Sequence, residues 1–237
     1  MIHVTGDIHG AVFERFTPEA MPGEDRWGAD DKLIVLGDFG LVFYPDGEQF
    51  RYERLLEQKK LEYLEAKPYE ILFIDGNHEN FDRLFAETTE EERYGGTVRR
   101  VGRNVFWLQR GQIYTIEGRT FFCMGGAYSI DKAFRLEGIS WWARESPTEK
   151  EMENASENLI AAGRKADYIL THNCPQVFIQ LMGYAANPND IALTSFFNWI
   201  WYEIEFGHWY FGHWHIDRDL HPKVTAMYES VRTPGGE

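Results

Sequence analysis

The stretch Ile2-His3-Val4-Thr5-Gly6-Asp7-Ile8-His9-Gly10 joins a short β-prone run to a glycine-bounded turn that carries an aspartate and a histidine. Short apolar runs bounded by glycine are consistent with buried strands. Asp7 and His9 are two residues apart, and in extended backbone such residues face the same side. The stretch therefore predicts a buried strand that sends two polar side chains into one site at its carboxyl end.

Four other short runs end in the same way, at a glycine or threonine near Asp, Asn or His. They are residues 32–36 before Gly37-Asp38, 70–74 before Asp75-Gly76-Asn77-His78-Glu79, 167–170 before Thr171-His172, and 209–211 before Gly212-His213-Trp214-His215. In open α/β sheets, sites form just outside the carboxyl ends of the strands. We therefore expect the polar residues of all five pieces to converge on one site.

Helical patterns between these runs predict an α/β fold. Residues 48–66 place apolar side chains on one face and charged side chains on the other. Ser146 is the expected cap of a helix over 148–162, with Pro147 at its first position. Asp190 is the expected cap of a third helix, which runs to about residue 206.

The remaining segments predict further strands and the limits of the domain. We expect an antiparallel group at 97–101, 105–108, 112–117 and 119–124, one or two strands within 223–231, and a solvated loop or helix end at the acidic run 90–92. No repeat or long linker divides the chain. We therefore predict one domain over residues 1–237 with a mixed, two-sheet core, an insert at about 126–150 near the site, and a flexible tail at 233–237.

Composition restricts the classes of partner. The 237 residues are 43% hydrophobic, which is ample for a sizeable core, and the formal net charge is −14. This acidic balance argues against stable binding to duplex nucleic acid or to an anionic membrane, which needs a basic face. A phosphate substrate stays open, because bound divalent cations can reverse the local charge of a site.

Three further features favour a protein of the cytoplasm. The two cysteines, Cys123 and Cys174, are far apart, which disfavours a disulfide framework. The amino-terminal residues become strand-like at once and lack the basic and apolar regions of a signal peptide. The most apolar stretch, near 195–211, is interrupted by charged residues and is too broken for a membrane span.

Seven polar side chains at the strand ends form a candidate ligand set for metal ions. They are Asp7, His9, Asp38, Asn77, His172, His213 and His215. Two carboxylates, one carboxamide and four imidazoles, with no thiolate, suit Mn, Fe, Zn, Co or Mg better than a structural zinc site. Seven ligands exceed what one tetrahedral ion takes and suit two ions that share a carboxylate. We therefore predict two divalent metal ions, with manganese first.

The five pieces in this order resemble the signature of the calcineurin-like metallophosphoesterases: Asp-x-His, Gly-Asp, Gly-Asn-His-Glu, a lone His, and Gly-His-x-His. The resemblance covers residues 7–215, and any one piece alone is weak. It implies a four-layer α/β/β/α sandwich with two mixed sheets and the metal site at the carboxyl ends of the strands. The segment after Met124 also resembles a bacterial and phage subgroup of these proteins.

The resemblance also implies a role for each residue. Asp7, His9 and His215 would hold one ion, Asn77, His172 and His213 would hold the other, and Asp38 would bridge them. A hydroxide between the ions would attack phosphorus in line, and His78 would act as general acid or stabilise charge near the leaving group.

The second piece departs from the Gly-Asp-x-x-Asp-Arg-Gly motif that is frequent among phosphomonoesterases of this superfamily. Residues 37–42 read Gly-Asp-Phe-Gly-Leu-Val, so the second Asp and the Arg are missing. In the fuller motif, that Asp orients the catalytic His and the Arg can bind phosphate. Asp75 and Glu79 are the expected replacements that orient His78. The departure puts a protein phosphatase in doubt.

A phosphate contact is expected from the segment after the third piece. Arg135 is the first candidate, because a guanidinium can bind phosphate through two hydrogen bonds, and Lys132 and Arg144 follow it. An ordinary surface arginine in a salt bridge is the competing interpretation. Monoesterase and diesterase activity both stay open, with a nuclease or nucleotide phosphodiesterase and a non-catalytic scaffold of the same fold as alternatives. The sequence leaves the oligomeric state open.

Overall fold

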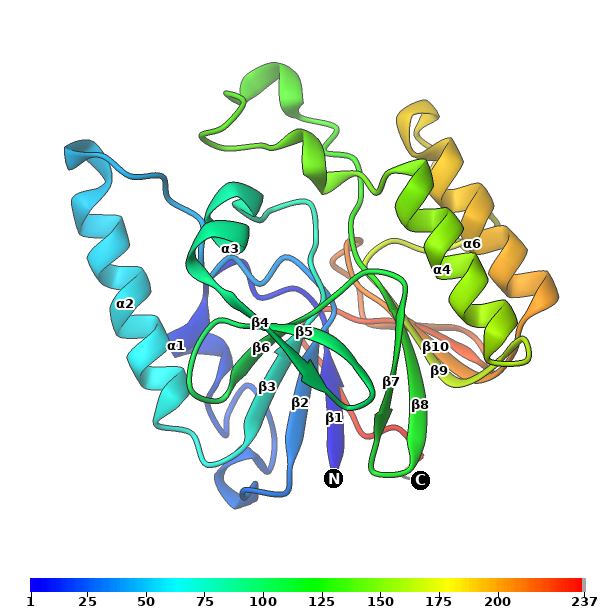
Figure 1. Cartoon of the computed structure of the whole chain (residues 1–237), viewed down its shortest axis with the longest axis horizontal. Helices are drawn as coiled ribbons and strands as arrows, with labels where there is room; N and C mark the ends of the chain where they lie inside the picture. Colours follow the sequence, from blue (N-terminus) through cyan, green and yellow to red (C-terminus); the bar gives the residue numbers. More distant parts are fainter. Residues whose placement is uncertain (236–237) are drawn as a thin grey trace.

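Two β-sheets pack face to face, and helices cover the outer side of each sheet (Figure 1). The computed structural model describes residues 1–235, so the last two residues of the predicted tail lie outside the described residues. Earlier residues of that tail contact the sheets. The Thr233 hydroxyl lies 3.1 Å from His3 Nδ1, and the carbonyl of Pro234 accepts a hydrogen bond from Arg119.

The first sheet has four central parallel strands and antiparallel strands at its edges. Its order is β13 (Val231–Arg232), β1 (Ile2–Thr5), β2 (Lys32–Val35), β3 (Glu70–Phe73), β6 (Val105–Leu108), β5 (Gly96–Arg100) and β4 (Thr89–Arg93). Its outer face packs against α1 (Val12–Arg15), α2 (Arg51–Glu65) and α3 (Phe81–Glu87).

The second sheet repeats this plan. Its order is β11 (Arg218–His221), β12 (Val224–Ala226), β10 (Glu205–Phe211), β9 (Lys165–Thr171), β8 (Arg119–Met124) and β7 (Gln112–Ile116), and only the two edge strands are antiparallel. Its outer face packs against α4 (Glu149–Ala161), α5 (Gln176–Leu181) and α6 (Ile191–Glu203). Within residues 1–235, no helix has the length and the apolar composition that a membrane span requires.

Burial of both faces of each sheet explains why the sequences of the central strands are continuously apolar. Val4, Ile34 and Leu72 of the first sheet share one buried cluster with Phe121 and Leu170 of the second. The opposite faces of the same strands pack under helices, so both faces are buried. The predicted four-layer α/β/β/α sandwich with two mixed sheets is confirmed.

Two strand predictions need correction. The expected antiparallel group is split, because β5 and β6 belong to the first sheet whereas the β7–β8 hairpin belongs to the second. The acidic run 90–92 is not a loop but part of β4. Glu90 faces Arg99 directly across the β4–β5 ladder, and Glu91 forms an ion pair of 2.7 Å with Arg100. Such cross-strand pairs stabilise a strand that its own β propensity disfavours.

The start of α4 also differs from the expectation. The cap is Thr148, not Ser146: the Thr148 hydroxyl accepts from the amide of Glu151, and the Glu151 carboxylate accepts from the amide of Thr148. This reciprocal arrangement needs Glu or Gln three residues after the cap, in the register of Thr148 and Glu151. Asp190 precedes α6 as expected, but its carboxylate accepts from the amide of Tyr128 and does not cap the helix.

Thr148→Ala should lower the free energy of unfolding by about 1 kcal/mol, because the amide of Glu151 at the start of α4 loses its partner. Ser146→Ala is the matched control, since the Ser146 hydroxyl oxygen is buried without a hydrogen-bond partner among residues 1–235. That variant should be neutral or slightly stabilising. Urea denaturation of both variants measures the difference, and equal losses would show that Thr148 is not the effective cap.

Candidate metal centre

The carboxyl ends of parallel strands from both sheets meet near the middle of Figure 1, below the loop that follows β8. The first sheet presents the residues that follow β1, β2 and β3, and the second presents those that follow β9 and β10. Asp7, Asp38, Asn77, His172 and His213 therefore come together although up to 206 positions separate them in the chain. The five sequence motifs converge on one site.

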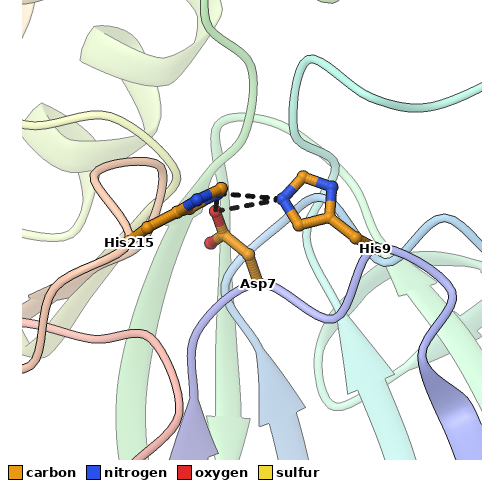
Figure 2. A group of neighbouring side chains, drawn as sticks. All are labelled: Asp7, His9 and His215. Atoms are coloured by element: carbon orange, nitrogen blue, oxygen red, sulfur yellow. Dashed lines mark hydrogen bonds and ion pairs between the residues drawn. The ribbon is translucent and has the colours of Figure 1, made fainter.

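One group of ligand atoms is formed by Asp7, His9 and His215. Figure 2 shows both imidazoles directed toward the Asp7 carboxylate. His215 Nε2 lies 3.2 Å and His9 Nε2 3.8 Å from Asp7 Oδ2, and the two ring nitrogens are 2.9 Å apart. These atoms are close enough to share one metal ion. The Asp7 side chain is buried, whereas those of His9 and His215 are 31% and 47% exposed, so this group is open to solvent.

A second group lies deeper and is formed by Asp38, Asn77 and His172. His172 Nε2 lies 3.0 Å from Asn77 Oδ1 and 3.4 Å from Asp38 Oδ1. The other carboxylate oxygen of Asp38 lies 3.6 Å from His9 Nε2. Asp38 therefore reaches both groups with one oxygen each.

His213 joins the two groups. Its amide donates to both carboxylate oxygens of Asp7, at 3.0 and 3.1 Å, and its ring centre lies 5.0 Å from that of His172. Burial lowers the pKa of His213 to about 3, so its imidazole is neutral at physiological pH and keeps a lone pair. All seven predicted ligands thus lie in this centre.

The backbone at the centre is left-handed at four of the seven residues. His9, Asp38, His213 and His215 have φ values of 50°, 45°, 67° and 49°, a region that residues other than glycine rarely adopt. Asp7 and His9 do lie together, but the alternation of side chains along a strand is not the cause. The pairing is made by a turn beyond the strand. Such strained backbone conformations are frequent at functional sites, and they persist where the surrounding structure imposes them.

Two glycines make the close approach of the motifs possible. A Cβ at Gly76 would lie 2.0 Å from Asp38 Oδ1, and a Cβ at Gly212 would lie 2.2 Å from Asp7 Oδ1. Any side chain at either position would displace a carboxylate of the centre. These glycines are required by the neighbouring motif rather than by their own backbone angles.

The hydrogen bonds around His172 test whether a cation fits. His172 Nδ1 lies 2.8 Å from the carbonyl oxygen of Leu36, which can only accept, so Nδ1 carries the proton. Without a proton Nε2 is an acceptor, and it faces two more acceptors, the oxygens of Asn77 and Asp38. These three atoms repel one another unless a positive charge lies between them. The donor set therefore fits a divalent cation.

A family model described as calcineurin-like phosphoesterase matches residues 1–217. The chain belongs to the calcineurin-like phosphoesterases. The resemblance seen in the five motifs is thereby confirmed. The family is metal-dependent, in agreement with two clusters of candidate ligands, Asp7 with His9 and His215, and Asp7 with Asp38 and His172.

Other comparisons add little to this assignment. No curated protein matches the chain. Among solved structures, the sulfate thiohydrolase SoxB of Thermus thermophilus in complex with glycerol is similar at a TM-score of 0.41 and 15% identity. The similarity covers 94% of this chain and 37% of that protein, so the chain spans little more than a third of its length.

In this calcineurin-like phosphoesterase, a buried chain of hydrogen bonds orients the carboxamide of Asn77. The Ser129 hydroxyl donates to Glu145 Oε2 at 2.9 Å and so accepts from Asn77 Nδ2 at 3.0 Å. This direction turns Asn77 Oδ1 toward His172. Lys132 completes the chain with an ion pair of 2.7 Å to Glu145, and its ammonium lies 3.9 Å from the ring centre of Tyr128.

Sequence reasoning missed Ser129 and Glu145. Ser129 follows β8, which is a parallel strand of the second sheet and ends at the same edge as the motifs. Its position after a strand was therefore a usable signal, although a serine alone carries no metal-ligand signature. Glu145 was not predictable, because only the folded insert brings it back to Ser129.

The replacements predicted to orient His78 are a second correction. Asp75 accepts from Arg110 at 2.6 and 2.8 Å and from the indole of Trp107, and Glu79 accepts from the amides of Phe39 and Gly40. Among residues 1–235, neither carboxylate has a hydrogen bond to the His78 ring. Asp75 instead neutralises a buried guanidinium, and Glu79 shapes the turn that follows Asp38.

Arg135 is the residue that meets His78. Its two Nη atoms lie 3.0 and 3.1 Å from the two ring nitrogens, so the guanidinium faces the imidazole. Asp131 holds Arg135 from behind, with Nη2 and a carboxylate oxygen 2.7 Å apart. Burial lowers the pKa of His78, and Arg135 acts in the same direction. The guanidinium is 17% exposed at the centre.

The two weaker phosphate candidates are engaged elsewhere. Lys132 is paired with Glu145. Arg144 lies over the ring of Phe85, with its guanidinium carbon 4.8 Å from the ring centre. Of the three cations proposed from the sequence, only Arg135 contacts His78.

Proposed function

We propose that this protein is a dinuclear metal-dependent hydrolase of phosphate esters. The observation that carries the proposal is the position of Asp38, whose two carboxylate oxygens face two separate groups of ligands at 3.4 and 3.6 Å. A single carboxylate in this position suits two ions better than one. Asp7 also approaches ligands of both groups, but less evenly, with 3.2 Å to His215 Nε2 and 4.0 Å to His172 Nδ1.

The ligands divide between the two ions. Asp7, His9 and His215 would hold the exposed ion, Asn77, His172 and His213 would hold the deeper ion, and both ions would share Asp38. Oxygen and imidazole ligands without thiolate favour manganese, with iron, zinc, cobalt and magnesium as the alternatives. Two such ions, when bound, lower the pKa of water to supply a nucleophile and neutralise charge on the phosphoryl group.

His78 and Arg135 act on the substrate. His78 directly follows Asn77, and its ring stands 5.2 Å from that of His9, which supports a role next to the proposed exposed ion. Burial lowers the pKa of His78, and Arg135 lowers it further while the two side chains face each other, so His78 would donate a proton to the oxygen of the leaving group once Arg135 has turned to the phosphoryl group. Arg135 donates to a phosphoryl oxygen, which is a stronger acceptor than an imidazole nitrogen, and so turns from His78 to the substrate when the substrate binds.

Metal analysis together with hydrolysis tests the proposal. Protein stripped with a chelator should lose hydrolysis of generic phosphate esters, and Mn²⁺ should restore it with two ions bound per chain, measured by elemental analysis. A phosphomonoester and a phosphodiester, each assayed with several metals, determine the preferred ester. Two bound ions without hydrolysis of either ester would favour a non-catalytic scaffold, and fewer than two ions with full activity would contradict the dinuclear centre.

His78→Gln should lower kcat by about 10²–10⁴-fold without loss of metal, because the ring contributes proton transfer and no ligand. The loss should be largest for substrates with poor leaving groups, which need a proton most. His221→Gln is a matched control, since His221 lies on the edge strand β11 and packs against Trp201. Equal losses for good and poor leaving groups would argue against an acid role.

A further inference from the structure

A pocket of 530 Å³ opens directly beside the candidate metal centre. Asp38, His78 and His213 line it. Tyr184 and Trp214 line it as well, and the ring centre of Trp214 lies 5.3 Å from that of His213. A phosphate held at the centre therefore has space beside it for the group that the phosphate esterifies.

Two stacked rings beside the centre form an aromatic wall of the pocket. The rings of Tyr184 and Trp214 are stacked, with centres 4.8 Å apart and an angle of 29° between their planes. The Trp214 indole N–H donates to Asn173 Oδ1 at 3.1 Å, which fixes the plane of the indole. Tyr184 is 48% exposed, so the stack still presents apolar surface. Trp214 lies in sequence between His213 and His215, two of the predicted ligands, so the aromatic wall lies next to the centre.

The charges around the pocket are negative. Asp131 and Asp190 line it, and within residues 1–235 no lysine or arginine does. Arg135, the cation nearest to His78, is paired with Asp131. A second phosphate or carboxylate on the substrate would therefore be repelled by these carboxylates. The charge of one phosphoryl group would be neutralised by the proposed metal ions and Arg135.

We propose that the pocket binds the organic part of a phosphate ester with a single phosphoryl group, and that this part is uncharged, flat and aromatic. The inference rests on the proposed function and adds the class of substrate to it. Polyphosphates and esters with a second anionic group should bind more weakly, because that group would approach Asp131 and Asp190. A planar ring gains by stacking on the aromatic wall, and an alkyl group of similar charge does not.

Three phosphonates test the inference by binding alone, because they are not hydrolysed. Calorimetric titration of the Mn²⁺-loaded protein should give a Kd for phenylphosphonate about tenfold lower than for methylphosphonate. 4-Carboxyphenylphosphonate should bind about tenfold more weakly than phenylphosphonate, because its added carboxylate approaches Asp131 and Asp190. Equal Kd values for methyl and phenyl, or tighter binding of the carboxylated ring, would overturn the inference.

A pair of tyrosine variants locates the effect. Tyr184→Ala should reduce the preference for phenyl over methyl to about twofold, whereas Tyr202→Ala, which removes an exposed tyrosine of α6, should keep it. A preference that survives Tyr184→Ala would show that the wall does not bind the ring.

The failure of this inference differs from the failure of the proposed function. If phosphonates bind without aromatic preference and esters are hydrolysed, the proposed hydrolase function is supported and the proposed substrate class is wrong. If none of the phosphonates binds and no ester is hydrolysed, both the proposed function and the proposed substrate class are wrong.

Discussion

Asp38→Asn should reduce hydrolysis of phosphate esters by about a thousandfold and lower the bound metal from two ions to one or fewer. The substitution keeps the shape of the side chain. It also keeps an oxygen that can accept the hydrogen bond from the amide of His78, which is 2.7 Å long in the wild-type chain. It removes the negative charge that faces both ligand groups. A thousandfold loss corresponds to about 4 kcal/mol, within the several kcal/mol that metal ions contribute to stabilising charge in a transition state.

Elemental analysis and steady-state kinetics on the same preparation check this prediction. Asp46→Asn is the control, because the Asp46 side chain is 89% exposed and pairs only with Arg54 among the described ion pairs. Near-ultraviolet circular dichroism of both variants shows whether the fold is kept. Two ions bound with an unchanged rate in Asp38→Asn would rule out a bridging role for this carboxylate.

Asp75→Asn should lower the free energy of unfolding by about 3–5 kcal/mol, which is typical when one partner of a buried ion pair is removed. The Asp75 side chain is completely buried and that of its partner Arg110 is 7% exposed. An asparagine would turn an N–H₂ group or a single oxygen toward three donors from Arg110 and Trp107. For a chain of this size the melting temperature should fall by about 6–20 °C.

The same variant separates a structural role from a catalytic one. Well below its melting temperature, Asp75→Asn should keep nearly the wild-type kcat, because the carboxylate does not touch His78. Asp219→Asn is the control, since Asp219 and Arg232 form an exposed pair whose loss should cost at most about 1 kcal/mol. A collapse of kcat without loss of stability would revive the expectation that Asp75 orients His78.

The fold and the ligand set were predictable because each depends on short-range pattern. Apolar runs that stop at glycine marked the parallel strands, and the polar residues just beyond them marked the site. The split between β6 and β7 was not predictable, since both runs have the same alternation and only packing decides which sheet takes each. Strand β4 was hidden for a related reason: its glutamates are paired across the ladder with arginines that lie about ten residues later.

The surroundings of His78 were the least predictable part of the site. Asp75 and Glu79 are its neighbours in sequence, but strand geometry sends their side chains to other partners. The residue that does reach His78, Arg135, comes from a loop 57 positions away. Sequence separation carries no information about a contact of this kind, and the guanidinium of Arg135 was proposed for its chemistry rather than for its place.

The link from Asn77 through Ser129 to Glu145 has a practical consequence for redesign. The loop between Met124 and Glu149 looks like a natural target for shortening or exchange, because it lies beyond the strand ends in Figure 1. Yet a graft that omits Ser129 or Glu145 would release the carboxamide of Asn77, which we propose as a metal ligand. Libraries should instead vary the tip, where Phe134 is 92% exposed, and keep both anchor residues fixed.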